Sequence, residues 1–352
     1  MNVLICNSAK SWGGNERWSA SLANGLAGRD HNVIMVTRAN IFSDLAENIS
    51  LEFADFKHEF NIKTYLKLFR IIKKNNIEII IATKLKEYFI CGLLGKLFNI
   101  PVVMRFGIER EISKYDLLRQ VAFNSFASKI IVNSWSIKTI LGKSNIDSSK
   151  IEVVYNGYDF NNNSVIEDFS HDKFIKKSNF VFGVVGRLSP QKGFDILIDS
   201  VKNLKGDFQI FIAGDGPDKE NYLNKIDEYG LNEKIILLGE IRNVRGFLSK
   251  CDCTIIPSRS EGIPNVMMES WSVETPVIAS RMSGNPEAIS DGFNGILFDL
   301  DSRKLSDLLQ KIISDNSIIS DFGKTGFETL KNNFSMKEML DKCENIFNKL
   351  RK

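Results

Sequence analysis

The sequence is poor in cysteine, proline and histidine: its 352 residues include five Cys, seven Pro and three His. Five cysteines without paired spacing do not form a disulfide framework, so we expect reduced thiols in a cytosolic protein. Cys251 and Cys253 have no His or further Cys nearby, and we expect them to be strand residues and not zinc ligands. None of His31, His58 and His171 follows a predicted strand, which leaves a histidine general base without support.

Long apolar segments are also missing. The closest candidate, Tyr88–Met104, is interrupted by Lys96 and Asn99, so no membrane-spanning helix is predicted. At the N-terminus the apolar run is only Val3–Cys6, which is much shorter than the core of a secretion signal. We therefore expect a cytoplasmic protein.

Charge of one sign is not in large excess, because 46 Lys and Arg against 43 Asp and Glu give a net charge of +3. A protein that coats nucleic acid is usually far more basic, so no nucleic-acid partner is expected. The charge is uneven along the chain. Residues 1–160 hold 21 basic and 15 acidic residues, a net of +6, whereas the rest of the chain has a net of −3. The first half is therefore the basic half.

Apolar runs of strand length alternate with helical patterns through most of the chain. Runs such as Glu78–Thr83 are typical of strands buried on both faces. This alternation predicts an α/β fold in which parallel sheets carry helices on both faces. We expect two doubly wound, Rossmann-like domains, residues 1–160 and 179–335, joined by a polar linker at 161–178. The amphipathic segment 336–352 is expected to form a terminal helix that packs back on the first domain. Because ligands of such folds bind outside the carboxyl ends of the strands, the expected site is a cleft between the domains.

The loop Gly186–Gly193, of sequence GRLSPQKG, directly follows a predicted strand and precedes a predicted helix. Arg187 and Lys192 lie in this loop, near the positive end of the helix. Two cations together with backbone N–H groups at such a position can bind a diphosphate. A solvated basic loop with a proline-containing turn is the alternative.

A second loop, Ser258–Glu269, also follows a predicted strand and reads SRSEGIPNVMME. Pro264 and Asn265 suit the start of a helix, which places Glu269 about one turn into it and Glu261 in the loop before it. Both carboxylates can then face one ligand, and carboxylates accept hydrogen bonds from paired hydroxyls such as those of a ribose or a sugar ring. A capping carboxylate with an unrelated surface Glu is the alternative.

Two shorter motifs are weaker. Gly13 and Gly14 follow the first strand and permit a close approach of the backbone to a ligand. The G-x-G-x-x-G spacing and the P-loop lysine are both missing there, so a plain turn is the alternative. The sequence Asp299-Leu300-Asp301 has the D-x-D form of some metal sites, but we expect a capped turn and no bound metal.

In their order along the chain, these motifs resemble those of the GT-B-fold glycosyltransferases of family 4, a retaining class. The resemblance extends over nearly the whole chain and is more specific in the second half. Its hallmark is the E-x7-E element from Glu261 to Glu269. The other matching stretches are GGNER at 13–17, VYNGYD at 154–159, GVVGRLSPQKG at 183–193, IAGDGP at 212–217, PSRSEGIPNVMMESWSVETPVIAS at 257–280, SGNPEAI at 283–289 and DGFNGILF at 291–298.

The resemblance implies a role for each matching residue. Arg187 and Lys192 would hold the diphosphate of a nucleotide-sugar donor, and Glu261, the third member of the catalytic set, would contact the transferred sugar. Glu269 would bind the ribose of the nucleotide. The other donor-binding positions implied by the resemblance are Gly13, Gly14, Gly186, Gly262, Ile263, Pro264, Asn265 and Val266.

One departure from the family concerns the first half of the chain. Many members carry a His after the fourth strand of the first domain, near the transferred sugar, whereas the corresponding stretch here, Val103–Arg110, has none. Arg105 or Glu109 would then occupy that space. Together with Arg17, they are the candidates for contact with the acceptor.

The function implied by the resemblance is transfer of a hexosyl or N-acetylhexosaminyl group from a nucleotide sugar to a glycan or glycolipid hydroxyl. UDP is favoured as the nucleotide by family frequency, and polysaccharide or lipopolysaccharide assembly as the process. Family members need no metal, so no cofactor is expected. Two alternatives stay open. One is a GT-B-like nucleotide-sugar epimerase, which the EGIPN sequence disfavours, and the other is a nucleotide-sugar-binding protein without catalytic activity.

Because a glycolipid acceptor lies in a membrane, membrane contact is part of the prediction. The segment Ile62–Lys74 combines Leu, Phe and Ile with five basic residues, and a basic amphipathic helix can lie on an anionic membrane. An ordinary helix whose apolar face packs on the sheet is the favoured interpretation. Peripheral contact of the basic N-terminal domain with the inner face of the cell membrane is the alternative.

Overall fold

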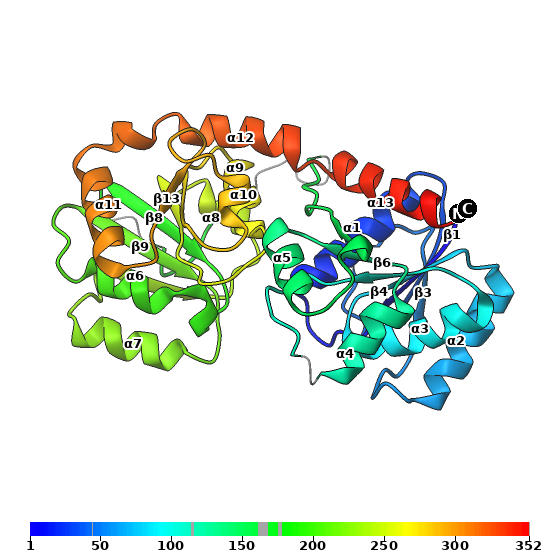
Figure 1. Ribbon diagram of the computed structural model, residues 1–352. Helices are drawn as coiled ribbons and strands as arrows, with labels where there is room; N and C mark the ends of the chain where they lie inside the picture. Colours follow the sequence, from blue (N-terminus) through cyan, green and yellow to red (C-terminus); the bar gives the residue numbers. More distant parts are fainter. Residues whose placement is uncertain (44, 114–115, 161–167, 175–177, 352) are drawn as a thin grey trace. The chain divides into compact units, whose positions relative to one another are not determined.

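The computed structural model describes residues 1–43, 45–113, 116–160, 168–174 and 178–351, which divide into two compact units (Figure 1). Unit 1 consists of Met1–Gly157 and Met336–Lys352, and unit 2 of Tyr158–Ser335. Each unit contains a parallel sheet with helices on both faces, which confirms the prediction of two Rossmann-like domains. Among the helices of the described residues, none has the length and apolar character needed to cross a bilayer.

The sheet of unit 1 has the strand order β3-β2-β1-β4-β5-β6-β7, and neighbouring strands run parallel. Apolar residues fill β1, β4 and β5 because helices cover both faces of the sheet. The strands are β1 (Asn2–Asn7), β2 (Asn32–Thr37), β3 (Ser50–Phe53), β4 (Ile79–Ala82), β5 (Val102–Arg105), β6 (Lys129–Val132) and β7 (Ile151–Val153).

Helices of unit 1 contribute to two separate cores, one on each face of the sheet. One face carries α2 (Ile62–Asn75), α3 (Leu85–Phe98), α4 (Leu117–Val121) continued by the π-helix η1 (Ala122–Phe126), and α5 (Trp135–Lys143). The other face carries α1 (Gly14–Ala27) and α13 (Met336–Leu350). The terminal helix packs closely on α1, since a Cβ atom added at Gly25 would lie 2.5 Å from the Leu340 side chain.

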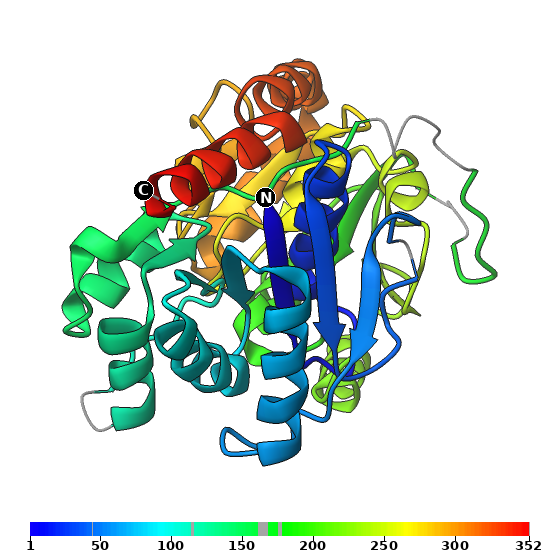
Figure 2. The same ribbon diagram turned by 90° about the vertical axis from the view of Figure 1, so that its right-hand side faces the viewer.

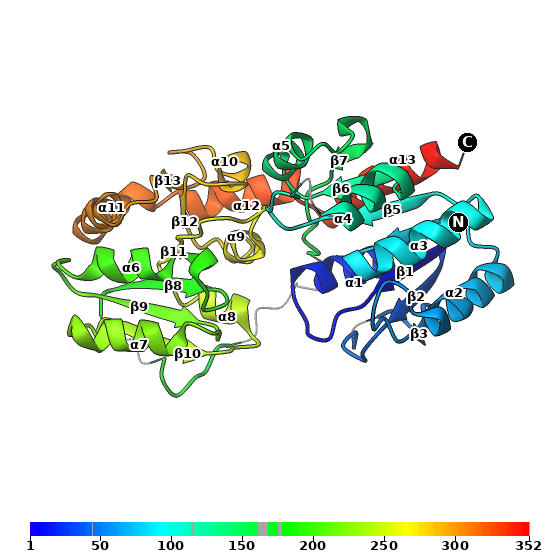
Figure 3. The ribbon, with the colours of Figure 1, turned by 60° about the horizontal axis from the view of Figure 1, so that its bottom comes forward.

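Unit 2 has the strand order β10-β9-β8-β11-β12-β13, again with parallel neighbours. Figure 3 shows α6 and α7 alongside β8 and β9, and α11 packs on α6 at the same face. The strands are β8 (Phe180–Val185), β9 (Phe208–Ala213), β10 (Ile235–Gly239), β11 (Cys253–Ile256), β12 (Val277–Ser280) and β13 (Ile296–Phe298). The helices are α6 (Phe194–Val201), α7 (Lys219–Glu228), α8 (Val244–Leu248), α9 (Asn265–Trp271), α10 (Asn285–Ala288), α11 (Ser302–Ser314) and α12 (Phe322–Asn333).

The segment 161–178, expected as a polar linker, differs in part from that expectation. Residues 161–167 and 175–177 lie outside the described residues. The described stretch between them belongs to unit 2 and packs on its helix α8 and strand β9: the Phe169 ring is 5.4 Å from that of Phe247, and the Phe174 ring is 4.5 Å from that of Phe211. Each of the two aromatic side chains buries a large apolar area, which favours the packing of this otherwise polar segment.

Candidate functional site

The two main sequence motifs follow adjacent strands of unit 2. The order of strands reverses between β8 and β11, and the carboxyl edge at such a reversal is where doubly wound folds bind ligands. The loop 186–193 follows β8, and the loop 257–264 follows β11. Two further loops, 214–218 after β9 and 281–284 after β12, reach the same edge. The structure therefore gathers at one place motifs that are far apart in the sequence.

The shape of the first loop depends on one glycine. A short 3-10 turn, Pro190–Lys192, ends at Gly193, whose φ of +70° lies in the left-handed region. A Cβ atom at this position would lie 2.0 Å from the carbonyl oxygen of Pro257, so no other residue fits. Helix α6 begins at the next residue. The backbone of the loop after β8 thus touches that of the loop after β11, and Lys192 is held beside this contact.

Lys192 and Glu261 form an ion pair in unit 2 although they are 69 residues apart in the sequence. The Lys192 ammonium donates a hydrogen bond to Oε1 of Glu261, and the Ser258 hydroxyl donates to the same oxygen at 2.6 Å. Only 22% of the Lys192 side chain and 14% of the Glu261 side chain are exposed. Arg187, in contrast, is exposed and has no ion pair among the described residues. The structure thus brings two of the three predicted catalytic residues together.

Arg259 connects the two loops and was missed by the sequence motifs. Its guanidinium forms two hydrogen bonds with the Asp195 carboxylate, at 2.7 and 2.6 Å, and a third with the carbonyl oxygen of Pro190 at 2.7 Å. Its backbone N–H donates to the carbonyl oxygen of Gln191 at 2.8 Å. The hydrogen bond from Arg259 keeps the pKa of Asp195 below its usual range. The sequence signals for this contact were the acidic residue Asp195 in the first turn of α6 and the basic residue Arg259, two positions before Glu261.

The loop after β9 packs against the first loop through glycines. A Cβ atom at Gly214 would lie 1.9 Å from the carbonyl oxygen of Gly186, and one at Gly216 would lie 2.3 Å from that of Leu188. The Leu188 N–H donates to the carbonyl oxygen of Asp215 at 3.0 Å. The GDGP sequence at 214–217 therefore supports the backbone that carries Arg187.

The loop after β12 supports Glu261 in the same way. A Cβ atom at Gly284 would lie 2.4 Å from the carbonyl oxygen of Gly262, and the Gly284 N–H donates to that of Glu261 at 3.1 Å. The Ser280 hydroxyl donates to the carbonyl oxygen of Ser258 at 2.5 Å. The loop that holds the predicted sugar-contacting carboxylate is therefore fixed on both sides.

Glu269, the second acid of the E-x7-E element, is the fifth residue of α9 and is partly exposed. Pro264 precedes the helix, as expected, and Asn265 is its first residue. The side chains of Ile263 and Val266 are buried. Contact of Glu269 with a ribose, and of the 262–266 backbone with a donor, stay predictions.

The candidates in unit 1 lie at the carboxyl edge of its sheet. Gly13 precedes α1, Gly14 is its first residue, and Arg17 is exposed in its first turn. Glu109 is partly buried and accepts a hydrogen bond from the hydroxyl of Ser136. Their predicted contacts with donor and acceptor are not tested by this geometry.

Arg105 ends β5 and is buried, with 3% of its surface exposed. Its guanidinium lies over the Trp18 ring, 4.9 Å from the centroid, and Nη2 donates to Oδ1 of Asn156 at 2.9 Å. Nε and Nη1 are buried without a hydrogen-bond partner, and no carboxylate pairs with Arg105 among the described residues. Burial lowers the pKa of Arg105 to about 10. One of the two residues predicted to occupy the space of the missing His is thus a buried cation that has no carboxylate partner among the described residues.

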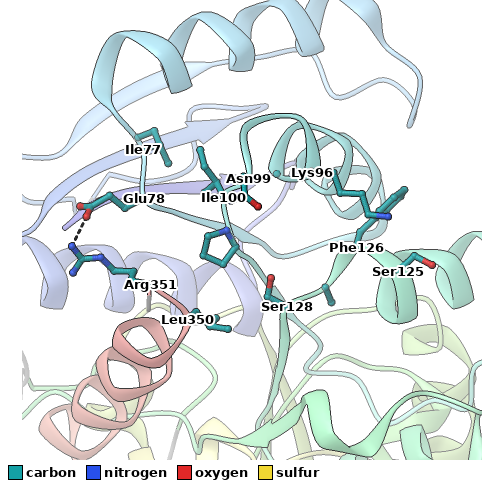
Figure 4. Close-up of a pocket in the computed structure, with 13 residues that line it drawn as sticks. Ile77, Glu78, Lys96, Asn99, Ile100, Ser125, Phe126, Ser128, Leu350 and Arg351 are labelled. Atoms are coloured by element: carbon teal, nitrogen blue, oxygen red, sulfur yellow. Dashed lines mark hydrogen bonds and ion pairs between the residues drawn. The ribbon is translucent and has the colours of Figure 1, made fainter.

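A pocket of about 640 Å³ in unit 1 lies elsewhere (Figure 4). Its lining includes Glu78 and Pro101, which precede β4 and β5, so it opens at the amino edge of the sheet and not at the carboxyl edge. The Arg351 guanidinium binds Glu78 at its rim. Among the described residues, no group of three or more His, Cys, Asp or Glu side chains is placed to hold a metal ion.

Comparison with known proteins identifies the family of this chain. A family model described as "Glycosyltransferase Family 4" matches residues 12–162, and one described as "Glycosyl transferases group 1" matches residues 165–329. Together they extend over both units. The break between the two matches falls close to the boundary between unit 1 and unit 2.

The curated relatives are glycosyltransferases. The lipopolysaccharide core biosynthesis glycosyltransferase LpsE of Rhizobium meliloti is 31% identical over 45% of this chain and 46% of its own length. An uncharacterized glycosyltransferase of Methanocaldococcus jannaschii, MJ1178, is 33% identical over 62% of this chain and 57% of its own. The chain thus spans about half the length of these two relatives. The UDP-Gal:alpha-D-GlcNAc-diphosphoundecaprenol alpha-1,3-galactosyltransferase of Escherichia coli is 25% identical over 88% of this chain and 83% of its own.

Among solved structures, Anabaena Alr3699/HepE in complex with UDP and glucose superposes with a TM-score of 0.84. It is 21% identical and covers 99% of this chain and 100% of that chain. At this identity the likeness establishes the fold, and the ligands belong to that protein.

Proposed function

Because the chain belongs to the GT-B-fold glycosyltransferases of family 4, we propose that it transfers a sugar from a UDP-linked donor to a hydroxyl of a lipid-linked glycan or glycolipid. The process would be the assembly of a cell-surface polysaccharide or lipopolysaccharide. UDP is supported by the UDP and glucose bound to the Anabaena neighbour, and the acceptor class by the diphosphoundecaprenol-linked acceptor in the name of the E. coli relative.

The observation that carries the proposal is the Lys192–Glu261 pair at the carboxyl edge of unit 2. In the proposed complex, Lys192 and the exposed Arg187 bind the donor diphosphate. Among the described residues nothing bonds Oε2 of Glu261, so this oxygen is available for a sugar hydroxyl while Oε1 stays on Lys192 and Ser258. Glu269 would bind the ribose.

In the proposed reaction the configuration at the sugar C1 is retained. The bond between C1 and the diphosphate oxygen breaks, and its electron pair leaves with the diphosphate. Arg187 and Lys192 stabilise the charge that develops on that group, so no metal is needed. The acceptor hydroxyl bonds to C1 on the same face and gives its proton to the departing phosphate. No protein base is required for that step.

Thermal unfolding with nucleotides tests the donor assignment. We expect UDP to raise Tm, because a ligand at about 100 times its Kd adds about 2.7 kcal/mol to the free energy of unfolding. Uridine is the control and should have little effect, because it lacks the diphosphate. If GDP or ADP raises Tm and UDP does not, the assignment of uracil as the base is wrong. If no nucleoside diphosphate raises Tm, the assignment of this edge as the donor site is wrong.

Release of UDP from a UDP-sugar distinguishes an enzyme from a binding protein. We expect slow release without acceptor and faster release with one, and no change on addition of EDTA. A protein that binds UDP-sugars but releases no UDP under either condition would be a binding module. Activity that EDTA abolishes would contradict the metal-free mechanism.

Arg105 provides a test of the acceptor side. A buried charge without a counter-ion has an uncompensated desolvation cost. Arg105→Met removes that charge and keeps an apolar side chain of similar length, so it should leave Tm unchanged or raised. If Arg105 contributes to acceptor binding, kcat/KM for the acceptor falls at least tenfold while the UDP-induced shift in Tm is kept. Unchanged kinetics in a stable Arg105→Met variant would remove Arg105 from the site.

A further inference from the structure

The stretch SGNPEAI at 283–289 resembles the family but has no part in the proposed reaction. Its first residue, Ser283, has a φ of +56°, a left-handed conformation that a residue other than glycine adopts only at a cost. The next residue donates its N–H to the carbonyl oxygen of Glu261, so the strained backbone lies beside the loop of that carboxylate. Such strain persists only where the surrounding structure holds the backbone in place.

Asn285 holds this backbone through its amide NH2 group. It is the first residue of α10 and is buried, with 2% of its surface exposed. Nδ2 donates to the carbonyl oxygen of Ser280 at 2.9 Å and to the hydroxyl oxygen of the same residue at 3.2 Å. Oδ1 of Asn285 is buried without a hydrogen-bond partner among the described residues, so the contact depends on the NH2 donor. The start of α10 is therefore anchored to Ser280, the last residue of β12.

From Ser280 the hydrogen bonds continue to the predicted sugar-contacting carboxylate. The Ser280 hydroxyl donates to the carbonyl oxygen of Ser258 at 2.5 Å, and the Ser258 hydroxyl donates to Oε1 of Glu261 at 2.6 Å. The neighbouring strands β11, β12 and β13 are yellow to orange in Figure 2, and the loops of Ser258 and Asn285 follow the first two of them. Both serines are buried, which strengthens hydrogen bonds between them. We call Asn285, Ser280 and Ser258 the Asn285 network.

We propose that Asn285 is a positioning residue for Glu261 and acts on it through the other two members of the Asn285 network. The inference rests on the proposed function, because the direction of the carboxylate matters when it contacts a transferred sugar. Lys192 and Ser258 both donate to Oε1, but the ammonium is also expected to bind the diphosphate, whereas the single hydroxyl proton of Ser258 is directed at Glu261. The network therefore keeps Oε2 in one position, as a preorganised site requires.

Asn285→Leu tests the network, because leucine has a similar shape but no donor. We expect kcat for sugar transfer to fall about 10- to 100-fold, the effect of a small misplacement in a catalytic site, while UDP raises Tm as in the wild type. The matched control is Asn294→Leu. Asn294 is also buried in unit 2, and its Nδ2 likewise donates to one carbonyl and one hydroxyl oxygen, those of Ala288 and Thr329, both at 3.1 Å. The control should lower Tm by at least as much and keep kcat.

Ser280→Ala tests the middle of the network, and it does so even if Asn285→Leu does not fold. It removes one buried hydroxyl, and we expect kcat to fall at least about fivefold, the equivalent of one hydrogen bond. Ser200→Ala is its control. The Ser200 hydroxyl is also buried in unit 2 but donates to the carbonyl oxygen of Leu197 within α6, at 2.7 Å. Its loss should leave kcat unchanged.

Hydrogen exchange measures the position of the loop without any substrate. The N–H groups of Gly284 and Arg259 donate to the carbonyl oxygens of Glu261 and Gln191, at 3.1 and 2.8 Å. In Asn285→Leu we expect these two N–H groups to exchange at least about tenfold faster than in the wild type, because the loop opens locally more often. In Asn294→Leu they should exchange at the rate of the wild type.

Two outcomes would overturn the role of Asn285. One is a kcat that Asn285→Leu leaves unchanged, or lowers no more than Asn294→Leu does. The other is exchange at Gly284 and Arg259 that Asn285→Leu does not accelerate. If the wild type transfers no sugar at all, the proposed function fails, whereas the exchange rates still decide whether Asn285 holds the loop of Glu261.

Discussion

Replacing Lys192 by Ala is expected to lower kcat by about 10²- to 10³-fold, the range for loss of one charge-stabilising group in an enclosed site. The reason is local: the ammonium is held by Glu261 at the carboxyl edge of unit 2, and only 22% of the side chain is exposed. A cation so fixed needs little rearrangement when charge develops on the diphosphate. Arg187→Ala should act in the same direction, because its exposed guanidinium is the second cation of the loop. Steady-state transfer assays measure both.

Loss of Lys192 also leaves Glu261 with Ser258 as its hydrogen-bond partner, so part of the effect could be structural. Lys192→Gln separates the two causes, since the amide can still donate a hydrogen bond to Glu261 but has no charge. We expect it to restore Tm and not kcat. Lys219→Ala, at the start of α7, removes a cation that is paired with Asp215 at 2.7 Å and serves as the control. Full activity of both Lys192 variants would contradict the mechanism.

The second large effect is expected from Gly193→Ala. At φ of +70° an alanine is strained by about 1–2 kcal/mol, and here its Cβ would also lie 2.0 Å from the carbonyl oxygen of Pro257. Since backbone must move to relieve that contact, we expect the free energy of unfolding to fall by at least about 3 kcal/mol. The loops after β8 and β11 would separate, and Lys192 would lose its position beside Glu261. Transfer activity should therefore fall with stability.

Gly230→Ala is the matched control for this steric argument. Its φ is +64°, but a Cβ atom there meets nothing within 4 Å, so only the backbone strain of about 1–2 kcal/mol applies. Urea unfolding curves give both free energies. Equal losses for the two variants would show that the backbone contact at Pro257 does not matter.

Much of the geometry of the candidate site in unit 2 could be predicted because parallel strands end at a common edge. Both GRLSPQKG and SRSEGIPN were predicted to follow strands, and in a parallel sheet such loops lie close to each other. The structure agrees, since Lys192 of the first loop forms an ion pair with Glu261 of the second. The role of Arg259 could not be predicted from the sequence, because it depends on a bidentate hydrogen bond with the Asp195 carboxylate, 64 residues away. The packing of Phe169 and Phe174 on α8 and β9 could not be predicted either, because the sequence around these two residues is polar.

By itself, the sequence determined the alternation of strands and helices, the family, and the residue types in the loops after β8 and β11, since these depend on local pattern. Tertiary structure decided which side chains are paired and which are left without partners. Periodicity assigns residues to opposite sides of a helix but does not say what covers each side. For that reason only the folded chain showed that Arg105 is a buried cation with no carboxylate partner in the described part of the chain, and that Leu66, Leu97 and Val121 remain exposed.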